Sequence, residues 1–255
     1  MTSQTQTNKP DIALDEKGSA AAHPEVSTLQ AMLDAGVHFG HRASRWSPKM
    51  QPYIHGLKGS VHVINVERTL EKLKEAEAFV EAIARKGGTV LFVGTKPSAK
   101  EIVEREAVRA GMPFMVNRWL GGLLTNFKSL SERLKYFLDL EGKRQRGELE
   151  KYTKKERLAF DKELAELEVK FGGVRQLVKT PDALYIVDVT HEETAAREAR
   201  RIKMPTVAII DTNADPTSVT HPVPGNDDAI SSIGFITVRI ADAILRGKAA
   251  ALRQE

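Results

Sequence analysis

Continuous apolar runs alternate with amphipathic segments along most of the 255-residue chain. Four of these runs predict strands, at 61–64, 89–94, 184–188 and 206–211. Helices are expected from the capping residue Asn65 to about Arg85, from Thr95 to Gly111, from a capping box at 190–193 to Arg201, and from Ile230 to Leu245. Because unbroken apolar strands linked through helices are typical of parallel sheets covered on both faces, the chain is predicted to have an α/β fold.

The segment 125–171 interrupts this alternation. Its apolar residues recur at spacings of three and four in two arms, which comprise Phe127, Leu130, Leu134 and Phe137, then Phe160, Leu164, Leu167 and Phe171. A capping box formed by Thr153 and Glu156 marks the start of the second arm. We interpret the segment as an antiparallel coiled-coil hairpin inserted between strands; two surface helices packed flat on the sheet are the alternative.

The domain organisation follows from these patterns. Residues 1–25 are polar and lack apolar periodicity, which predicts a disordered N-terminal extension. The α/β core is expected over 26–124 and 172–247, with the hairpin at 125–171 inserted into it and a flexible C-terminal tail over 248–255.

Composition narrows the function classes. The absence of cysteine excludes a disulfide-stapled fold, a thiolate metal site and a cysteine nucleophile. No apolar run reaches the ~18 residues of a membrane span, and the N-terminus lacks the layout of a signal or transit peptide, so we expect a cytoplasmic protein without a membrane partner. The formal charge of +4 is mildly basic, so any nucleic-acid binding depends on where the charges lie.

A catalytic constellation is hard to find. Gly94, Thr95 and Lys96 follow a predicted strand and precede a helix, where a phosphate could bind, but no glycine-rich fingerprint is present. The stretch from Gly122 to Ser129 resembles a P-loop, but Phe127 replaces the second glycine and no strand precedes it, so we reject it. No catalytic residue and no cofactor is therefore predicted.

Metal binding has weak support from the sequence. Acidic side chains at strand ends could hold a divalent cation, although such residues also form turns; these are Asp188, Asp211 and Asp215. The histidines gathered near the N-terminus suggest a metal site but lack a carboxylate at a matching spacing; these are His38, His41, His55 and His62. We predict no metal site and leave both clusters open.

Two basic loops are stronger candidates for a functional site, because their composition suits nucleic-acid binding. The loop 36–60 interleaves basic side chains with aromatic ones and contains no acid, and the loop 117–128 places an Arg-Trp pair beside two glycines. Basic side chains can neutralise phosphates while aromatic rings stack on bases or anchor the loop. The candidate RNA-binding residues are Arg42, Arg45, Trp46, Lys49, Lys58, Arg118, Trp119 and Lys128. Simple packing of the two tryptophans is the alternative.

The same loops carry a family resemblance. The stretches AGVHFGHRASRWSPKMQPYIHG, NRWLGGLLTNF, PDALYIVD and PVPGNDDAI occur in an order and spacing that resemble the bacterial small-subunit ribosomal protein S2 family over about residues 26–247. The resemblance implies a flavodoxin-like parallel sheet with helices on both faces and a protruding coiled-coil hairpin.

The implied role is structural. The resemblance implies binding to 16S rRNA and to other small-subunit proteins, help in seating the largest, mRNA-recruiting one, and no catalysis or small-molecule substrate. Ser231 stands where the family usually has a basic residue, and Val-Thr-His follows Asp188 where Pro-Lys-Lys is common. The runner-up is a nucleotide- or phosphate-binding α/β enzyme that uses Thr95, Lys96, Asp188 and Asp211.

Overall fold

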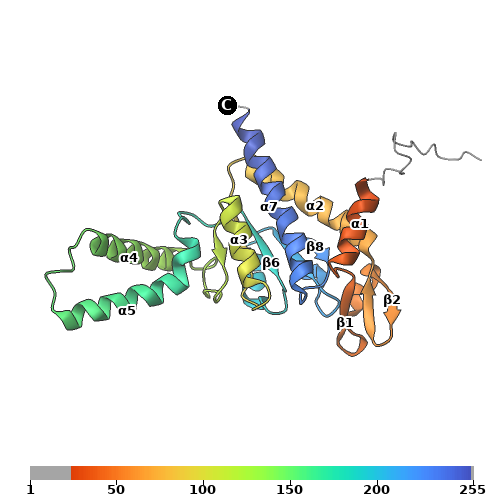
Figure 1. Ribbon diagram of the computed structural model, residues 1–255, viewed down its shortest axis with the longest axis horizontal. Helices are drawn as coiled ribbons and strands as arrows, with labels where there is room; N and C mark the ends of the chain where they lie inside the picture. Colours follow the sequence, from red (N-terminus) through yellow and green to blue (C-terminus); the bar gives the residue numbers. More distant parts are fainter. Residues whose placement is uncertain (1–23, 254–255) are drawn as a thin grey trace, which may run out of the picture.

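A five-stranded parallel sheet forms the centre of the molecule (Figure 1). This computed structural model describes residues 24–253. The strands are β4 (Val90–Val93), β5 (Phe114–Met115), β6 (Ala183–Val187), β7 (Thr206–Ile210) and β8 (His221–Pro224). Their order in the sheet is β5-β4-β6-β7-β8, which is 2-1-3-4-5 when counted along the chain, the order of doubly wound flavodoxin-like sheets. The predicted α/β class and the strands at 89–94, 184–188 and 206–211 are confirmed.

The two edge strands escaped prediction for physical reasons. β5 is only two residues long, too short for a periodic pattern. β8 contains Pro222 and Pro224, and proline is tolerated in a sheet chiefly on edge strands because it cannot donate to a neighbour.

Alternate side chains of the central strands enter two separate cores. Phe92 and Tyr185 face one core, whereas Leu91 and Leu184 face the other. Every residue of β4, β6 and β7 is buried, as expected for parallel strands that are covered on both faces.

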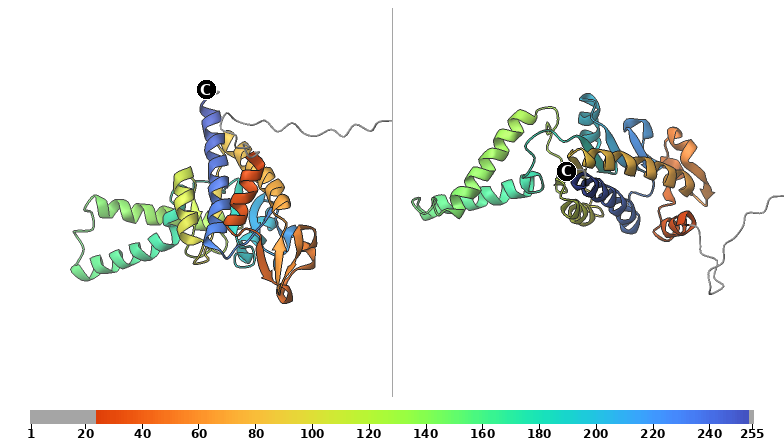
Figure 2. Two further views of the ribbon diagram at one scale, coloured as in Figure 1. Left: turned by 45° about the vertical axis from the view of Figure 1, so that its right-hand side comes forward. Right: turned by 90° about the horizontal axis from the view of Figure 1, so that it is seen from above.

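Helices cover the two faces unequally (Figure 2). The first face packs against α1 (Pro24–Asp34), α2 (Val66–Arg85), α3 (Lys100–Ala110) and α7 (Ile230–Leu252). The second face packs against α6 (Glu193–Arg201), the segment 119–124 and the bases of two further helices. The predicted cap of α2 is confirmed, since the Asn65 side chain accepts hydrogen bonds from the amides of Glu67 and Arg68.

Several predicted boundaries need correction. The capping box at 190–193 is wrong: α6 begins at Glu193 without a side-chain cap, and the Glu193 carboxylate pairs with Arg197 within the helix instead of reaching back to Thr190. α3 begins at Lys100 rather than near Thr95, although it ends at Gly111 as predicted. The helices α1 and α7 extend to Pro24 and Leu252, so they take residues from the predicted extension and tail; residues 1–23 lie outside the described part.

A small antiparallel sheet stands beside the parallel one. It contains β1 (Phe39–Arg42), β2 (Ile54–Lys58) and β3 (Val61–Ile64) in the order β1-β3-β2. The strand predicted at 61–64 therefore exists, but it does not belong to the parallel sheet. The amides of His41 and Ser47 donate to Thr212 at 2.9 and 2.7 Å, and Gly40 allows this approach because a Cβ there would lie 2.6 Å from the Thr212 side chain.

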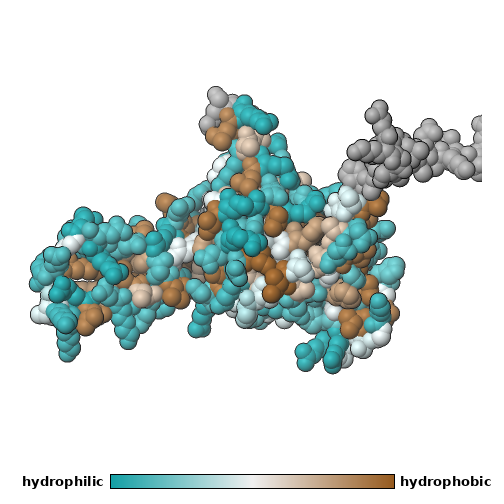
Figure 3. All heavy atoms as spheres, viewed as in Figure 1, coloured by the Kyte–Doolittle hydropathy of each residue, from teal (hydrophilic) through white to brown (hydrophobic). Residues whose placement is uncertain are grey.

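Two helices project from the other end of the molecule (Figures 1 and 2). They are α4 (Phe127–Gln145) and α5 (Lys154–Phe171), they run in opposite directions, and the predicted capping box at Thr153 is present. Their facing apolar residues are buried, among them Phe137 and Leu164, whereas their outward surface is largely hydrophilic (Figure 3). The structure shows a projecting helical pair; its description as a coiled coil stays a prediction.

Candidate nucleic-acid interface and the adjoining charged cluster

The carboxyl ends of the parallel strands gather most of the candidate residues. Thr95 and Lys96 follow β4, and Asp188 and Asp211 follow β6 and β7. The small sheet adjoins this edge at the β7 side through the contacts to Thr212. Because the strand order reverses between β4 and β6, this edge is where open α/β sheets commonly bind ligands.

A lysine and three aspartates form a charged cluster at the edge. The Lys96 ammonium lies 3.0 Å from the Asp188 carboxylate and 3.2 Å from that of Asp227, and it also pairs with Asp228. Burial lowers the pKa of Lys96, but the hydrogen bonds and charges of these aspartates outweigh burial and leave it raised. Burial and the neighbouring charges of Asp188 and Asp211 raise the pKa of Asp227 to about 7.

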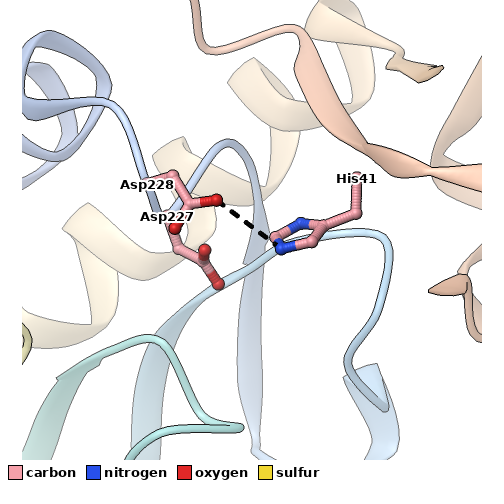
Figure 4. Close-up of side chains that lie close together, drawn as sticks. All are labelled: His41, Asp227 and Asp228. Carbon is pink, nitrogen blue, oxygen red and sulfur yellow. Dashed lines mark ion pairs between the residues drawn. The ribbon is translucent and has the colours of Figure 1, made fainter.

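His41 joins the cluster from the small sheet. Its Nδ1 lies 3.0 Å from the Asp211 carboxylate, and its Nε2 lies 3.6 Å from Oδ2 of Asp228. Figure 4 shows the imidazole facing Asp227 and Asp228. The hydrogen bond to Asp211, helped by the surrounding carboxylates and opposed by burial, raises the pKa of His41 to about 9. The ionic contacts therefore tie β1 to the loops after β7 and β8.

This arrangement disfavours the phosphate-binding enzyme. A phosphate at the β4 end would meet the carboxylates of Asp188 and Asp227, and the ammonium of Lys96 is already paired with both. The Thr95 amide donates to Glu192, so it is not available to an anion. The runner-up hypothesis thus loses its proposed phosphate ligands.

The segment rejected above as a P-loop holds a carboxylate of the protein itself rather than a phosphate. The amides of Gly122, Leu124 and Thr125 donate to the carboxylate of Glu198, as does the indole of Trp119. Burial raises the pKa of Glu198, but these hydrogen bonds outweigh it and leave the pKa lowered. Nothing in the local sequence points to Glu198, because the glutamate lies on α6, far along the chain.

The basic side chains of the first loop fall into two groups. Arg42 and Lys58 both stand opposite Val61, on the strands that flank β3, so they share one end of the small sheet with Arg45 close by in the chain. All three are exposed, and none forms an ion pair with any residue from 24 to 253. Lys49 differs: although the loop itself contains no acid, Lys49 pairs at 2.7 Å with Asp215 from a distant part of the chain, so it is not a free cation.

The second loop supplies Arg118 and Lys128. Both are exposed and unpaired within the described residues. Arg118 lines a cavity of about 290 Å³ with Thr95, His191 and Glu192, at the β4 and β5 side of the edge. The structure thus places the two basic loops toward opposite sides of the charged cluster and does not merge them into one patch.

The two tryptophans have different surroundings. Trp46 is 37% exposed and packs against His62 with ring centroids 5.2 Å apart, so part of its ring faces solvent. Trp119 is only 8% exposed, and its indole donates to Glu198. A stacking role for Trp119 does not fit this burial; the side chain anchors the loop that presents Arg118.

The remaining candidate residues are dispersed. His41 alone of the clustered histidines meets the acidic residues, since His62 packs on Trp46 and His38 on Phe39. Asp215 lies apart, where it pairs with Lys49 and caps a turn. Ser231, which replaces the usual basic residue, donates to the carbonyl of Ala35 at 2.8 Å and so ties the start of α7 to the end of α1.

Comparison with known families decides between the ribosomal and the enzymatic hypothesis. A family model described as ribosomal protein S2 matches residues 32–247. The chain belongs to the ribosomal protein S2 family. It is therefore a non-enzymatic structural protein of the small ribosomal subunit that binds rRNA and ribosomal proteins. Among the described residues, no helix is both long and apolar enough to cross a bilayer.

The family match covers every part of the candidate site. The match begins inside α1 and ends inside α7, so it spans both basic loops, the charged cluster and the helical pair. Sequence reasoning missed Asp227 and Asp228 as partners of His41 and Lys96, even though the motif that contains them was part of the resemblance. The signal was present in the acidic pair that directly follows Asn226, but only the fold brings it to His41.

Proposed function

We propose that this S2-family chain docks on 16S rRNA through the two basic loops at the carboxyl edge of its parallel sheet. The observation that carries the proposal is the exposure, without acidic partners in the described residues, of Arg42, Arg45, Lys58, Arg118 and Lys128. Basic side chains held this way neutralise phosphates and release counterions without first breaking an ion pair. Specificity then comes from the shape of the folded rRNA that fits both loops.

The two loops are held rigidly enough to act together. The Arg118 loop is fixed by the hydrogen bonds to Glu198, and the small sheet is fixed by Thr212 and by the ionic contacts of His41. The charged cluster between them carries its own cations in Lys96 and His41, which moderates repulsion of the backbone phosphates. Trp46 offers a partly exposed ring for stacking.

The projecting pair is proposed as a coiled-coil arm for neighbouring proteins or as a brace. Its buried seam, which includes Leu134 and Leu167, and its mixed-charge outer surface support a self-contained hairpin. We also propose that the chain helps to seat the largest, mRNA-recruiting protein. Phe39 and Leu57 expose apolar side chains on opposite faces of the small sheet, and either face is suited to such a contact.

Reconstitution of small subunits lacking this protein tests the docking mode. The change of Arg42, Arg45 and Arg118 to alanine is expected to weaken association and to lower the slope of log K against log salt by about 3, since each lost phosphate contact removes about one unit. The matched control changes three other exposed arginines to alanine and so removes the same total charge. Each of them already pairs with a glutamate of its own helix; they are Arg68, Arg85 and Arg197.

Three outcomes are informative. Weaker association of the first variant alone supports docking through the loops. Equal behaviour of the two variants contradicts it. The content of the largest protein in subunits reconstituted with Phe39→Ser and Leu57→Ser tests the seating role, because a loss of that protein with unchanged chain occupancy is expected.

A further inference from the structure

An apolar cavity of about 420 Å³ lies between the Arg118 loop and the end of α5. Residues 117–121 form one wall, and Val169 and Lys170 form the other. The surface of the cavity is almost entirely apolar, and Leu120 and Val169 both retain exposed area. Small-ligand sites in proteins are typically concave and mainly apolar, with volumes of ~300–1,000 Å³. The cavity therefore has the size and the lining of a binding pocket for a small planar group.

Contacts on both sides hold the walls of this pocket in place. The Asn117 side-chain amide donates to the carbonyl of Val169 at 3.0 Å and so joins the loop to α5. Behind the loop, the Glu198 carboxylate accepts from the amides of Gly122 and Leu124. A site that is formed before its ligand arrives does not have to be ordered by binding, which favours affinity.

The charges at the rim of the pocket are positive. Arg118 and Lys170 both line it, both are exposed, and neither forms an ion pair with a residue of 24–253. Arg118 also lines two adjoining cavities, but one of these includes Glu192 and the other includes Glu104 and Glu168. Of the three cavities, the largest alone has no carboxylate in its wall. It therefore suits a ligand that has an apolar planar part and a negative charge beside it.

We propose that this pocket binds the base of one unpaired rRNA nucleotide, with the neighbouring backbone phosphates against Arg118 and Lys170. The inference rests on the proposed rRNA docking and names one contact within it. Proteins recognise RNA chiefly at loops and bulges, where a base that has left the stack packs against apolar, aromatic or guanidinium surfaces. Trp119 is only 8% exposed, so the base would rest mainly on Leu120, Val169 and the guanidinium of Arg118.

The pocket would add selectivity to docking that is otherwise guided by shape and charge. A base paired within an A-form helix cannot enter it, so the rRNA must present an unpaired nucleotide at this point. An apolar side chain of a neighbouring protein is the competing occupant. Such a side chain would leave Arg118 and Lys170 without a counter-charge, whereas a nucleotide supplies one, and this difference favours the nucleotide.

Filling the pocket tests the proposal in reconstituted small subunits. Val169→Trp fills it from α5, and Gly121→Leu fills it from the loop, where a Cβ would meet no atom within 4 Å. Both changes should weaken association ~5–150-fold, the value of one stacked base. The salt dependence should stay unchanged, because Arg118 and Lys170 remain. The matched control is Val108→Trp on α3, since Val108 is 63% exposed and Val169 is 59% exposed; this variant should associate normally.

Chemical probing of the rRNA bases identifies the occupant. Reagents that modify the Watson–Crick edges should find one unpaired base that is protected in subunits with the native chain or Val108→Trp. The same base should become reactive with Val169→Trp and with Gly121→Leu, at protein concentrations that keep the subunits fully occupied. A photoreactive diazirine amino acid in place of Val169 should cross-link to that nucleotide.

The outcomes separate the pocket from the docking mode. A cross-link to protein alone, or base reactivities that do not respond to filling of the pocket, would overturn the nucleotide proposal. If Val169→Trp associates normally while the Arg42, Arg45 and Arg118 triple variant loses salt dependence, the pocket proposal fails and docking through the loops stands. If the triple variant is also unaffected, both proposals fail.

Discussion

The carboxylate of Glu198 should be a main determinant of how the Arg118 loop is held. It accepts hydrogen bonds from Trp119 Nε1 at 3.1 Å, from the amides of Gly122 and Leu124 at 2.7 and 3.1 Å, and from the amide and hydroxyl of Thr125 at 3.3 Å. Removal of Glu198 leaves these donors without an acceptor. Trp119 and Leu124 are buried, so their donors cannot simply turn to solvent.

The magnitude follows from the two buried donors. Each buried donor left unsatisfied costs ~1–3 kcal/mol, so Glu198→Ala should lower the free energy of unfolding by about 4 kcal/mol. Glu198→Gln keeps one acceptor oxygen but loses the charge-assisted bonds, so a loss of about 2 kcal/mol is expected. Urea denaturation of the full chain measures both values, and hydrogen exchange at the Leu124 amide reports the loop directly.

A neighbouring glutamate provides the control. Glu193 lies on the same helix, is exposed and forms an i,i+4 pair with Arg197, so Glu193→Ala should cost less than about 1 kcal/mol. If Glu198→Ala and Glu193→Ala had the same unfolding free energy, or if Leu124 exchange were unchanged, the loop would not depend on the carboxylate and the reasoning would be refuted.

Two further predictions concern the loop and the helix packing. The pKa of Glu198 is lowered from the usual 4.5, so the stability that its carboxylate contributes is complete above that pH and is lost as the pH falls through the lower pKa of the folded state. The unfolding free energies of the native chain and of Glu198→Gln should therefore converge in acid. A difference that stays constant with pH would contradict this. Gly247→Ala should destabilise by ~1–3 kcal/mol in thermal unfolding, because its Cβ would lie 2.4 Å from the Glu81 carbonyl where α7 crosses α2. Gly234→Ala, whose Cβ would lie 3.7 Å from Ile102, should instead stabilise by ~0.5–1 kcal/mol, and equal effects of the two would contradict the packing argument.

The sequence predicted the elements whose patterns are local. The runs at 89–94 and 206–211 were recognised because every residue of the corresponding strands is buried, and the cap at Asn65 depends only on the next three residues. Two strands of the small sheet were missed because they are short and only partly buried, and the predicted strand at 61–64 was assigned to the wrong sheet because its pairing depends on contacts across 39–64.

Only part of the site was predictable, because several of its contacts join residues that are distant in the sequence. The exposed arginines of the two loops could be found by charge alone, since no acid stands beside them in the chain. The pairing of Lys49 with Asp215, and the burial of Trp119 against Glu198, are made by residues that are distant in sequence. The capping box at 190–193 failed because Glu193 pairs with Arg197 and the amide of His191 donates to Asp188, so the turn before α6 is held by other contacts.

The central claim is that the chain docks through its basic carboxyl edge, and lysine footprinting of the small subunit tests it most directly. Lys58 and Lys128 belong to the two loops, whereas Lys86 and Lys203 are exposed where α2 and α6 end, at the opposite edge. The account predicts that assembly sharply reduces acetylation of Lys58 and Lys128 relative to the free chain and leaves Lys86 and Lys203 reactive. Protection of Lys86 and Lys203 with full reactivity of Lys58 and Lys128 would contradict it.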